Sequence, residues 1–280
     1  MKLKAITLLA YDTAFMLESI KTYIDIVDEL YIGLDENRQT WAGSTYELEP
    51  GIEAKLKALS PKVRILEEQF YIPGLNTMEN DTRERNLISS HVDEVDYILS
   101  VDSDEFLLNP NELASWLRQQ TEEDVCILGS WITVYKELDD AYLVIANKSG
   151  PDLGDVPIIT DRTDCFVNAR WTKQKYVMSP AVLLHFSWAR SEAELRKKLV
   201  NWSHSDDFST QQHLDLWLNA NERTYKNYKN FHPVTPESWP ALVLIEKTQL
   251  SAVAAELARE KSRGIATSPS GLAQNASVGQ

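Results

Sequence analysis

The sequence predicts an α/β fold built on a mostly parallel sheet with helices on both of its faces. Strand-like apolar runs alternate with helix-like segments through residues 3–119, which is the order of a parallel sheet. Three of these runs lead to an aspartate, Asp12, Asp35 or Asp102, and ligands bind at that carboxyl edge of such sheets. With 280 residues, 43% of them hydrophobic, the chain can form one large domain with a substantial core.

Each expected element in this half has its own local pattern. The strands are apolar runs bounded by polar residues, and the helices carry apolar residues at helical spacing, as Leu87, Ile88 and Val92 do. Pro110 follows Asn109 and suits the first position of a helix. The expected strands cover 3–10, 29–34, 63–70 and 97–101, and the expected helices cover 13–28, 51–60, 80–95 and 110–119.

The second half is less regular. Ser191 and Glu194 fit a capping box that opens a helix to about Val200. Strands are expected over 124–135, 141–146 and 181–188, a loop-rich pocket lining over 147–164, and a helix over 240–261. The expected organisation is one domain over 1–210, a helical C-terminal extension packed on it over 211–261, and a small, polar, disordered tail over 262–280.

Charge and composition exclude several classes of protein. A formal net charge of −14 argues against nucleic-acid binding, which needs a basic face. Cys126 and Cys165 belong to no Cys-x-x-Cys pair, so two free thiols in a reducing cytoplasm are expected. The apolar stretch at the start is too short for a signal peptide, and no run reaches the length of a membrane span. No feature indicates an oligomeric state.

The segment YILSVDSDEFLL, residues 97–108, carries the most specific chemistry. An apolar run leads into Asp102, Ser103, Asp104 and Glu105, and apolar residues resume at Phe106. Burying unpaired carboxylates is costly, whereas two carboxylates at a strand end can share Mg²⁺ or Mn²⁺ that also holds a diphosphate. The alternative is a strand that ends in a solvated acidic turn, which explains the immediate return to apolar residues less well.

Two stretches resemble a known family. Arg85-Asn86 followed by YILSVDSDEFLL, and HFSWARSEAELRKKLVNWSHSDDF at 185–208, are similar to GT-A-fold glycosyltransferases of the family-2-like group with an Asp-x-Asp-Glu-Phe motif. The order of elements extends the resemblance over roughly residues 1–210. The resemblance implies a GT-A (Rossmann-like) fold and a hexosyltransferase dependent on Mn²⁺ or Mg²⁺. Such an enzyme moves a sugar from a nucleotide-sugar donor, with a UDP-sugar the best guess, to a glycan or another hydroxyl acceptor.

The resemblance also implies roles for the acidic residues and the histidine. Asp104 would bind the metal directly, and Asp102, with Ser103 beside it, would meet the nucleotide ribose or the metal through water. His185 would be a further metal ligand, as imidazole nitrogen suits borderline Mn²⁺. It interrupts an apolar strand between Leu184 and Phe186, and the alternative is a hydrogen-bonded core histidine.

Other residues are expected to contact the donor. The resemblance implies that Asp12 and Asp35 meet the base and ribose, and the alternative for each is a turn-forming aspartate. Arg83 and Arg85 lie on the helix that approaches the acidic strand, where guanidinium groups suit phosphate or carboxylate. The alternative for both arginines is pairing with nearby acids such as Glu79 or Glu84.

The acceptor side is less defined. An inverting reaction needs a carboxylate base, for which Asp161 and Asp164 are candidates, while a retaining reaction needs none. Trp131 and Trp188 suit either stacking on sugars or a core position. His204 and Asp207 follow the helix of the second stretch and suit either closing over the site or a surface loop.

Rival functions lack specific residues. A nucleotidyltransferase usually has a glycine-rich signature after its first strand, and this chain has none there. An EF-hand needs glycine at the sixth position of its loop, and Leu107 stands there instead. Phe106 stands where a haloacid-dehalogenase-type phosphatase would have threonine. A non-catalytic module that binds nucleotide sugars or glycans remains the alternative, with a nucleotidyltransferase behind it.

Overall fold

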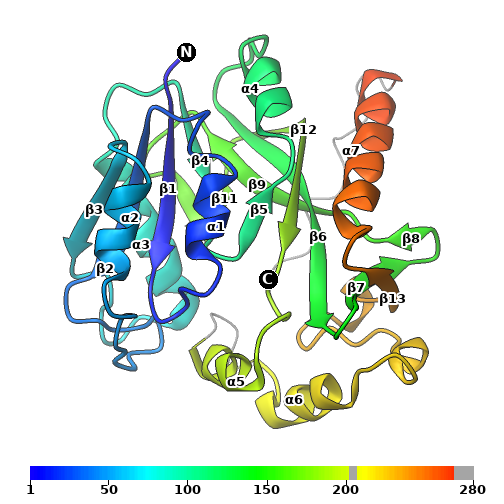
Figure 1. Ribbon diagram of the computed structural model, residues 1–280. Helices are drawn as coiled ribbons and strands as arrows, with labels where there is room; N and C mark the ends of the chain where they lie inside the picture. The colour runs from blue at the N-terminus through cyan, green and yellow to red at the C-terminus, as the bar shows by residue number, and fades with distance from the viewer. Residues whose placement is uncertain (202–206, 268–280) are drawn as a thin grey trace.

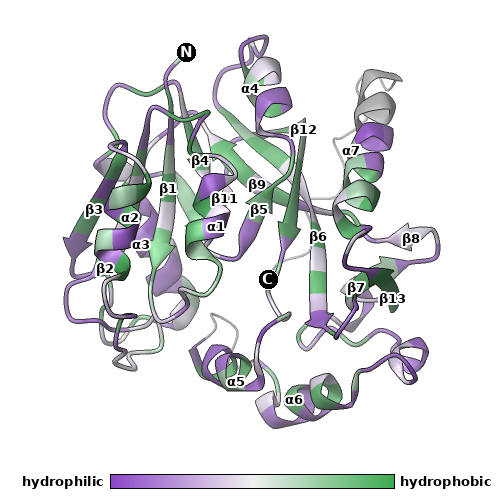
Figure 2. Ribbon diagram, viewed as in Figure 1, coloured by the Kyte–Doolittle hydropathy of each residue, from purple (hydrophilic) through white to green (hydrophobic). Residues whose placement is uncertain are grey.

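The computed structural model describes residues 1–201 and 207–267 (Figure 1). Within these residues, eleven strands form one sheet whose main path runs β13-β7-β6-β9-β4-β1-β2-β3, with β12 beside β6, β5 beside β12 and β8 beside β7. Helices lie against the sheet, so the predicted α/β class is confirmed. Figure 2 shows mainly hydrophobic residues on the central strands, while the helices α1 and α2 alternate between hydrophobic and hydrophilic residues.

The N-terminal half of the sheet is parallel. β1 pairs with β2 on one side and β4 on the other, and β2 pairs with β3. Alternate residues of β1 face opposite sides, as the pleat requires: Ala5 packs in the core shared with α1, α2 and α4, whereas Ile6 packs with Ile88 of α3. These elements are β1 (Leu3–Leu9), α1 (Met16–Lys21), β2 (Glu29–Asp35), α2 (Ile52–Leu59), β3 (Val63–Glu68), α3 (Thr77–Ser90), β4 (Tyr97–Ser100) and α4 (Pro110–Leu117).

The other half of the sheet is mixed. β12 pairs with β6 in parallel and with β5 in antiparallel fashion, and β13 joins the edge through β7. The elements of this half are β5 (Glu105–Leu107), β6 (Val125–Glu137), β7 (Ala141–Asn147), β8 (Gly150–Pro151), β9 (Gly154–Thr160), β12 (Lys175–His185) and β13 (Ala241–Glu246). A separate small hairpin is formed by β10 (Phe166–Asn168) and β11 (Trp171–Thr172).

The prediction of loops over 147–164 is wrong for its second part. β9 occupies 154–160 and lies antiparallel between β4 and β6, in the middle of the sheet. Val156, Ile158 and Ile159 are buried there. The glycine, proline and aspartate residues of this stretch are typical of loops, so the sequence does not predict β9, which is stabilised by pairing with the distant strands β4 and β6.

The prediction of a helical extension after residue 210 is wrong in part, because this segment also contains a strand. Residues 241–246 of the predicted helix form β13, and the helix α7 begins at Leu250 and ends at Thr267. The predicted tail therefore begins within α7, and its residues 268–280 lie outside the described part. The capping box of Ser191 and Glu194 is confirmed. The remaining elements are α5 (Glu192–Asn201), α6 (Thr210–Asn219) and the short helices η1 (Tyr225–Asn227) and η2 (Pro236–Ser238).

An aromatic core supports this end of the molecule. Trp188, Trp217, Trp239 and Tyr135 are buried together beneath α5 and α6. Figure 1 shows α5 and α6 beyond the carboxyl ends of β1, β6 and β12, where the parallel strands direct their terminal residues. Across the described residues, no helix combines the length and apolar character needed to cross a bilayer. Cys126 and Cys165 are free thiols, as predicted.

Candidate active site

A cavity of about 690 Å³ lies at this carboxyl edge. Its walls come from the ends of β1, β2, β4 and β12, from α3 and α5, and from the β10–β11 hairpin. Both acidic and basic side chains reach it, and several tryptophans line it. The acidic, basic and histidine residues of the lining are Asp12, Asp35, Asp81, Glu84, Arg85, Asp102, Asp104, Asp152, Arg170, His185, Lys198 and His232.

Asp102, Ser103 and Asp104 form a tight turn between β4 and β5. The backbone N–H of Glu105 donates to the Asp102 carbonyl at 3.1 Å, and the Glu105 carboxylate accepts from the Asp102 N–H at 3.0 Å. Ser19 of α1 donates to the Glu105 carbonyl at 2.6 Å. These bonds fix the turn and direct Asp102, Ser103 and Asp104 to the cavity.

His185 reaches Asp104 because of strand register. β12 pairs with β5 so that His185 lies opposite Glu105, and the Phe186 N–H donates to the Asp104 carbonyl at 2.9 Å. His185 Nε2 is 3.6 Å from Asp104 Oδ1. Trp131 stacks on the imidazole with ring centroids 4.4 Å apart and planes inclined by 17°. The structure thus brings together two of the three predicted metal ligands.

The imidazole is not held as an ordinary core histidine. Its Nδ1 is buried and has no hydrogen-bond partner in the described part of the chain. Burial lowers the pKa of His185, which keeps the ring neutral and its nitrogens available. A neutral ring with one nitrogen facing a carboxylate oxygen suits metal binding better than structural support.

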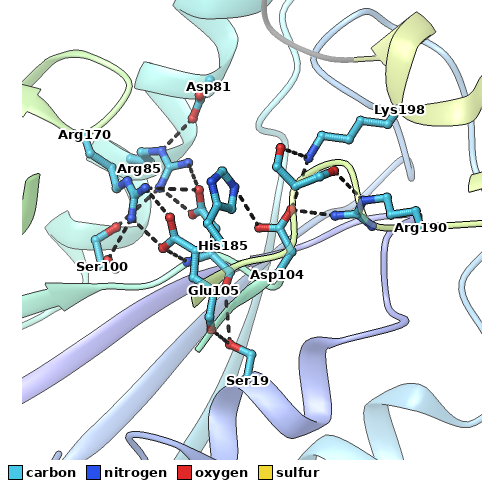
Figure 3. A network of polar contacts seen from close by, with 12 residues as sticks. Ser19, Asp81, Arg85, Ser100, Asp104, Glu105, Arg170, His185, Arg190 and Lys198 are labelled. Atoms are coloured by element: carbon cyan, nitrogen blue, oxygen red, sulfur yellow. Dashed lines mark hydrogen bonds and ion pairs between the residues drawn. The ribbon is translucent and has the colours of Figure 1, made fainter. Parts of the chain in front are cut away.

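The second oxygen of Asp104 carries two cations. Oδ2 accepts from Arg190 at 2.5 Å and from Lys198 at 3.1 Å (Figure 3). Arg190 also pairs with Asp12, and Lys198 also donates to Ser187 Oγ at 3.0 Å. Burial alone raises the pKa of the Asp104 carboxyl, but Lys198 and Arg190 outweigh it and hold the pKa far below its usual range. Asp104 is therefore an anion throughout the physiological range.

Asp102 is held by arginine instead. Arg85 donates to both of its oxygens, at 2.9 and 3.2 Å, and Arg170 lies 3.8 Å away. Arg85 is itself anchored by Asp81 at 2.6 Å and is buried. Burial raises the pKa of Asp102, but Arg85 and Arg170 reverse this effect and lower it overall. The pocket role predicted for Arg85 and its alternative, pairing with a nearby acid, both describe part of what the structure shows.

Two of the predicted metal ligands are placed where they could hold a divalent cation together. Asp104 Oδ1 and His185 Nε2 face each other, while Arg85 occupies both oxygens of Asp102. Over residues 1–201 and 207–267, no group of three or more His, Cys, Asp or Glu side chains is arranged to hold a metal ion. Direct ligation by Asp102 thus finds no geometric support, and further ligands would come from a bound substrate and water.

Asp12 and Asp35 lie at the cavity but are engaged elsewhere. Asp12 pairs with Arg190. Asp35 accepts four backbone N–H groups: Oδ1 from Asn37 and Gln39, and Oδ2 from Phe70 and Tyr71, at 2.9–3.0 Å. Since a carboxylate accepts about four hydrogen bonds, Asp35 shapes the loops that border the cavity and has no capacity left for a base or ribose.

Three other predicted residues lie away from the cavity. Arg83 donates to the carbonyls of Gln69 and Phe70 and is absent from the lining. Asp161 follows β9, which runs antiparallel to β4, so it lies at the opposite end of the sheet from Asp102. There it accepts from the Val125 N–H and from Gln174.

Asp164 borders a separate surface hollow beside α3. Neither Asp161 nor Asp164 is therefore placed to act as the base. Trp131 and Trp188 both line the cavity, and Trp188 is at the same time a buried core residue. Of the two residues expected to close over the site, His204 lies outside the described residues and Asp207 is absent from the cavity lining.

Sequence reasoning missed several residues of the site. Arg170, from the β10–β11 hairpin, pairs with the fully buried Glu105 through two bonds of 2.6 and 2.8 Å. Lys198 arrives from α5. Glu84 of α3 accepts from the Trp41 indole at 2.6 Å, and burial raises the pKa of Glu84 to about 8. Arg170 has no local motif. Lys198 lies within the second resembling stretch and Glu84 beside Arg85, but nothing along the chain distinguishes either from its neighbours, so the assembled fold is needed to place them in the site.

Comparison with known proteins gives weak likenesses. No protein-family model matches the chain, and no curated protein matches it. Among solved structures, it is similar to GalNAc-T7 with UDP, GalNAc and Mn²⁺, with 9% identity and a TM-score of 0.41 over 77% of this chain and 51% of that one. It is also similar to S. aureus TarS 1–349, with 13% identity and a TM-score of 0.30 over 47% of this chain and 36% of that one.

A third likeness is to glucosyl-3-phosphoglycerate synthase from Mycobacterium tuberculosis in complex with Mn²⁺, UDP and phosphoglyceric acid. There the identity is 18% and the TM-score 0.30, over 47% of this chain and 43% of that one. The chain thus spans between about a third and a half of the length of these three structures. Such scores carry no argument about activity, and the function proposed next rests on the site itself.

Proposed function

We propose that this chain is a GT-A-type glycosyltransferase that uses Mn²⁺ or Mg²⁺ and moves a sugar from a nucleotide-sugar donor to a hydroxyl of a glycan or similar acceptor. The observation that carries the proposal is the pair formed by Asp104 Oδ1 and His185 Nε2, 3.6 Å apart on the wall of the cavity. A carboxylate and a neutral imidazole form a natural site for a borderline divalent cation. The cavity beside them has the size of a small-molecule site.

The chemistry follows from what the leaving group needs. A divalent cation held by Asp104 and His185 would neutralise the negative charge that develops on the departing diphosphate. Arg85 and Arg170 also line this wall, but Asp102 and Glu105 pair with them, so the cation would supply the net positive charge there. Trp41, Trp131 and Trp171 supply flat apolar faces in the same cavity, against which sugar and base rings can stack. A UDP-sugar remains the first donor to test.

The test pairs binding with turnover. Thermal shifts of the wild-type protein are measured with UDP-, GDP-, CMP- and dTDP-sugars, with and without Mn²⁺. A ligand that binds only the folded state raises the melting temperature. At least one donor is expected to stabilise the protein in a Mn²⁺-dependent way, and that donor is then assayed for transfer to sugar acceptors and for hydrolysis.

Two variants make the assay specific. Asp104→Asn keeps the shape of the side chain but removes the anionic ligand, so it should abolish both the Mn²⁺-dependent shift and turnover. Asp139→Asn, at an exposed site outside the cavity lining, should change neither. The proposal fails if no donor shifts the wild-type protein. Donor binding without consumption under any acceptor would favour the sugar-binding module instead.

A further inference from the structure

Lys198 occupies an unusual position in the site. Its ammonium comes from α5, is buried, and lies on the cavity wall. It contacts two side chains, Asp104 Oδ2 at 3.1 Å and Ser187 Oγ at 3.0 Å. Ser187 lines the same cavity. The ammonium therefore lies beside the oxygen of Asp104 that faces away from His185 (Figure 3).

Asp104 does not need Lys198 for its structural support. Arg190 already contacts the same oxygen at 2.5 Å and continues to Asp12, and it does not line the cavity. Arg190 is thus the cation that braces the carboxylate from behind. Lys198 adds a second cation on the open side, where a ligand can reach it.

The balance of charge also favours an anion beside Lys198. Asp12 and Asp104 are matched by Arg190 and Lys198 in the free protein. A divalent cation on the other oxygen of Asp104 would leave this group with two excess positive charges, of which the neighbouring cluster of Asp81, Asp102 and Glu105 against Arg85 and Arg170 offsets only one. Buried charge without a partner is costly, so the balance is restored by a ligand that brings several negative charges at once. The diphosphate of a nucleotide sugar does so.

The type of side chain suits this exchange. A lysine ammonium sits on a flexible stem and has three donors, of which Asp104 and Ser187 use two. Lysine can turn from a carboxylate to a phosphate oxygen without moving the backbone. Arginine in the same place would be fixed by its planar fork.

We propose that Lys198, supported by Ser187, binds the terminal phosphate of the donor's diphosphate, on the opposite side of Asp104 from the cation. This rests on the proposed use of a nucleotide-sugar donor. Lys198 is then a substrate-binding residue that contributes to leaving-group stabilisation. In the free protein its charge weakens the attraction of Asp104 for the divalent cation.

The test compares diphosphates with monophosphates. UDP, GDP, CDP and dTDP, each paired with its monophosphate, are titrated with Mn²⁺ into wild type and Lys198→Met by calorimetry. The variant should lose about tenfold or more in affinity for the diphosphate, as expected for one charge-assisted hydrogen bond. Its affinity for the monophosphate should stay within about twofold. Lys197→Met, one residue away and exposed, is the matched control and should behave as wild type.

A second measurement distinguishes phosphate binding by Lys198 from a purely structural role of this residue. Mn²⁺ affinity without nucleotide, followed by electron paramagnetic resonance, should be unchanged or tighter in Lys198→Met, because a competitor for Asp104 is gone. A merely structural role would weaken it. If Lys198→Met melts too low to be titrated, Lys198→Gln, which can still bond Asp104 and Ser187, replaces it with the same expectations.

The outcomes are distinct. If wild type binds no diphosphate with Mn²⁺, the proposed function and the role of Lys198 fall together. If wild type binds one and the variant binds it within twofold, or if the variant loses diphosphate and monophosphate equally, the role of Lys198 alone is overturned.

Discussion

His185 Nε2 faces Asp104 Oδ1 at 3.6 Å, although His185 ends β12 and Asp104 lies far away in the sequence, in the turn between β4 and β5. The antiparallel pairing of β5 and β12 sets this distance, because it places His185 opposite Glu105. The other oxygen of Asp104 is held by Arg190 and Lys198. Removing the whole side chain would therefore deprive Lys198 of its acidic partner and leave Arg190 with Asp12 alone, so asparagine, which keeps the shape, is the informative replacement.

The buried pair of Arg170 and Glu105 should matter for stability. Glu105 is 0% exposed, so Arg170→Met leaves an uncompensated buried charge. We expect a loss of about 3–5 kcal/mol in the free energy of unfolding, measured with urea. Lys175→Met, which breaks the exposed pair with Glu122, is the control and should cost less than about 1 kcal/mol. Similar small losses in both variants would show that the buried pair is not needed.

Glu84 should make stability depend on pH. Burial raises its pKa from 4.5 to about 8. Between these values the unfolded chain releases the proton while the folded protein keeps it, so the stability contributed by Glu84 falls as pH rises. The fall is at most about 1.4 kcal/mol per pH unit. Urea unfolding at pH 5 and pH 8 should show a larger decrease in wild type than in Glu84→Gln. An identical decrease in both proteins would refute the assignment.

Trp131 should fix the orientation of His185. The two rings are stacked, and Gly154 lies directly behind the indole. A Cβ at position 154 would come within 2.5 Å of Trp131 Nε1, so Gly154→Ala must displace the indole. We expect Gly154→Ala and Trp131→Leu to weaken Mn²⁺ binding several-fold in a protein that still folds. Trp171→Leu, at an exposed residue of the cavity lining, serves as control, and equal effects of all three would argue against a positioning role.

Asp35 should act as a structural brace. Its four accepted backbone bonds join the loops after β2 and β3. Asp35→Asn loses part of this acceptor capacity, and we expect it to cost about 1.5–3 kcal/mol of unfolding free energy. Glu36→Gln, exposed and adjacent, should have little effect. An asparagine variant that is as stable as wild type but binds nucleotide more weakly would contradict this, and would support contact of Asp35 with the base or ribose of the nucleotide.

The sequence predicted the parallel half of the fold well, for local reasons. β1, β2 and β4 are mainly apolar runs, β3 is a mixed run with apolar residues at Val63, Ile65 and Leu66, and the predicted limits of all four lie within about two residues of those observed. Helix limits were less accurate, because α1 covers only Met16–Lys21 of a predicted helix over 13–28. Its apolar residues Ile24 and Val27 are buried by irregular turns instead.

The site was predictable only where a motif was local. Asp102 and Asp104 interrupt apolar sequence, and His185 does so in a second strand, so each was visible along the chain. Arg170 was not, since a single basic residue gives no signal along the chain, and Lys198, although inside the stretch 185–208, could not be told from its neighbour Lys197. The choice of Asp161 as a base failed because β9 was not recognised as an antiparallel strand, which reverses the end of the sheet at which that residue lies.

Mn²⁺ affinity tests the central claim most directly. Electron paramagnetic resonance titrations of wild type, Asp104→Asn, His185→Ala and the exposed control Asp139→Asn give the affinity without any donor or acceptor. If Asp104 and His185 hold the cation together, each of the two site variants should lose about tenfold or more, and the control should match wild type. Wild-type affinity in both Asp104→Asn and His185→Ala would contradict the metal site on which the proposed function rests.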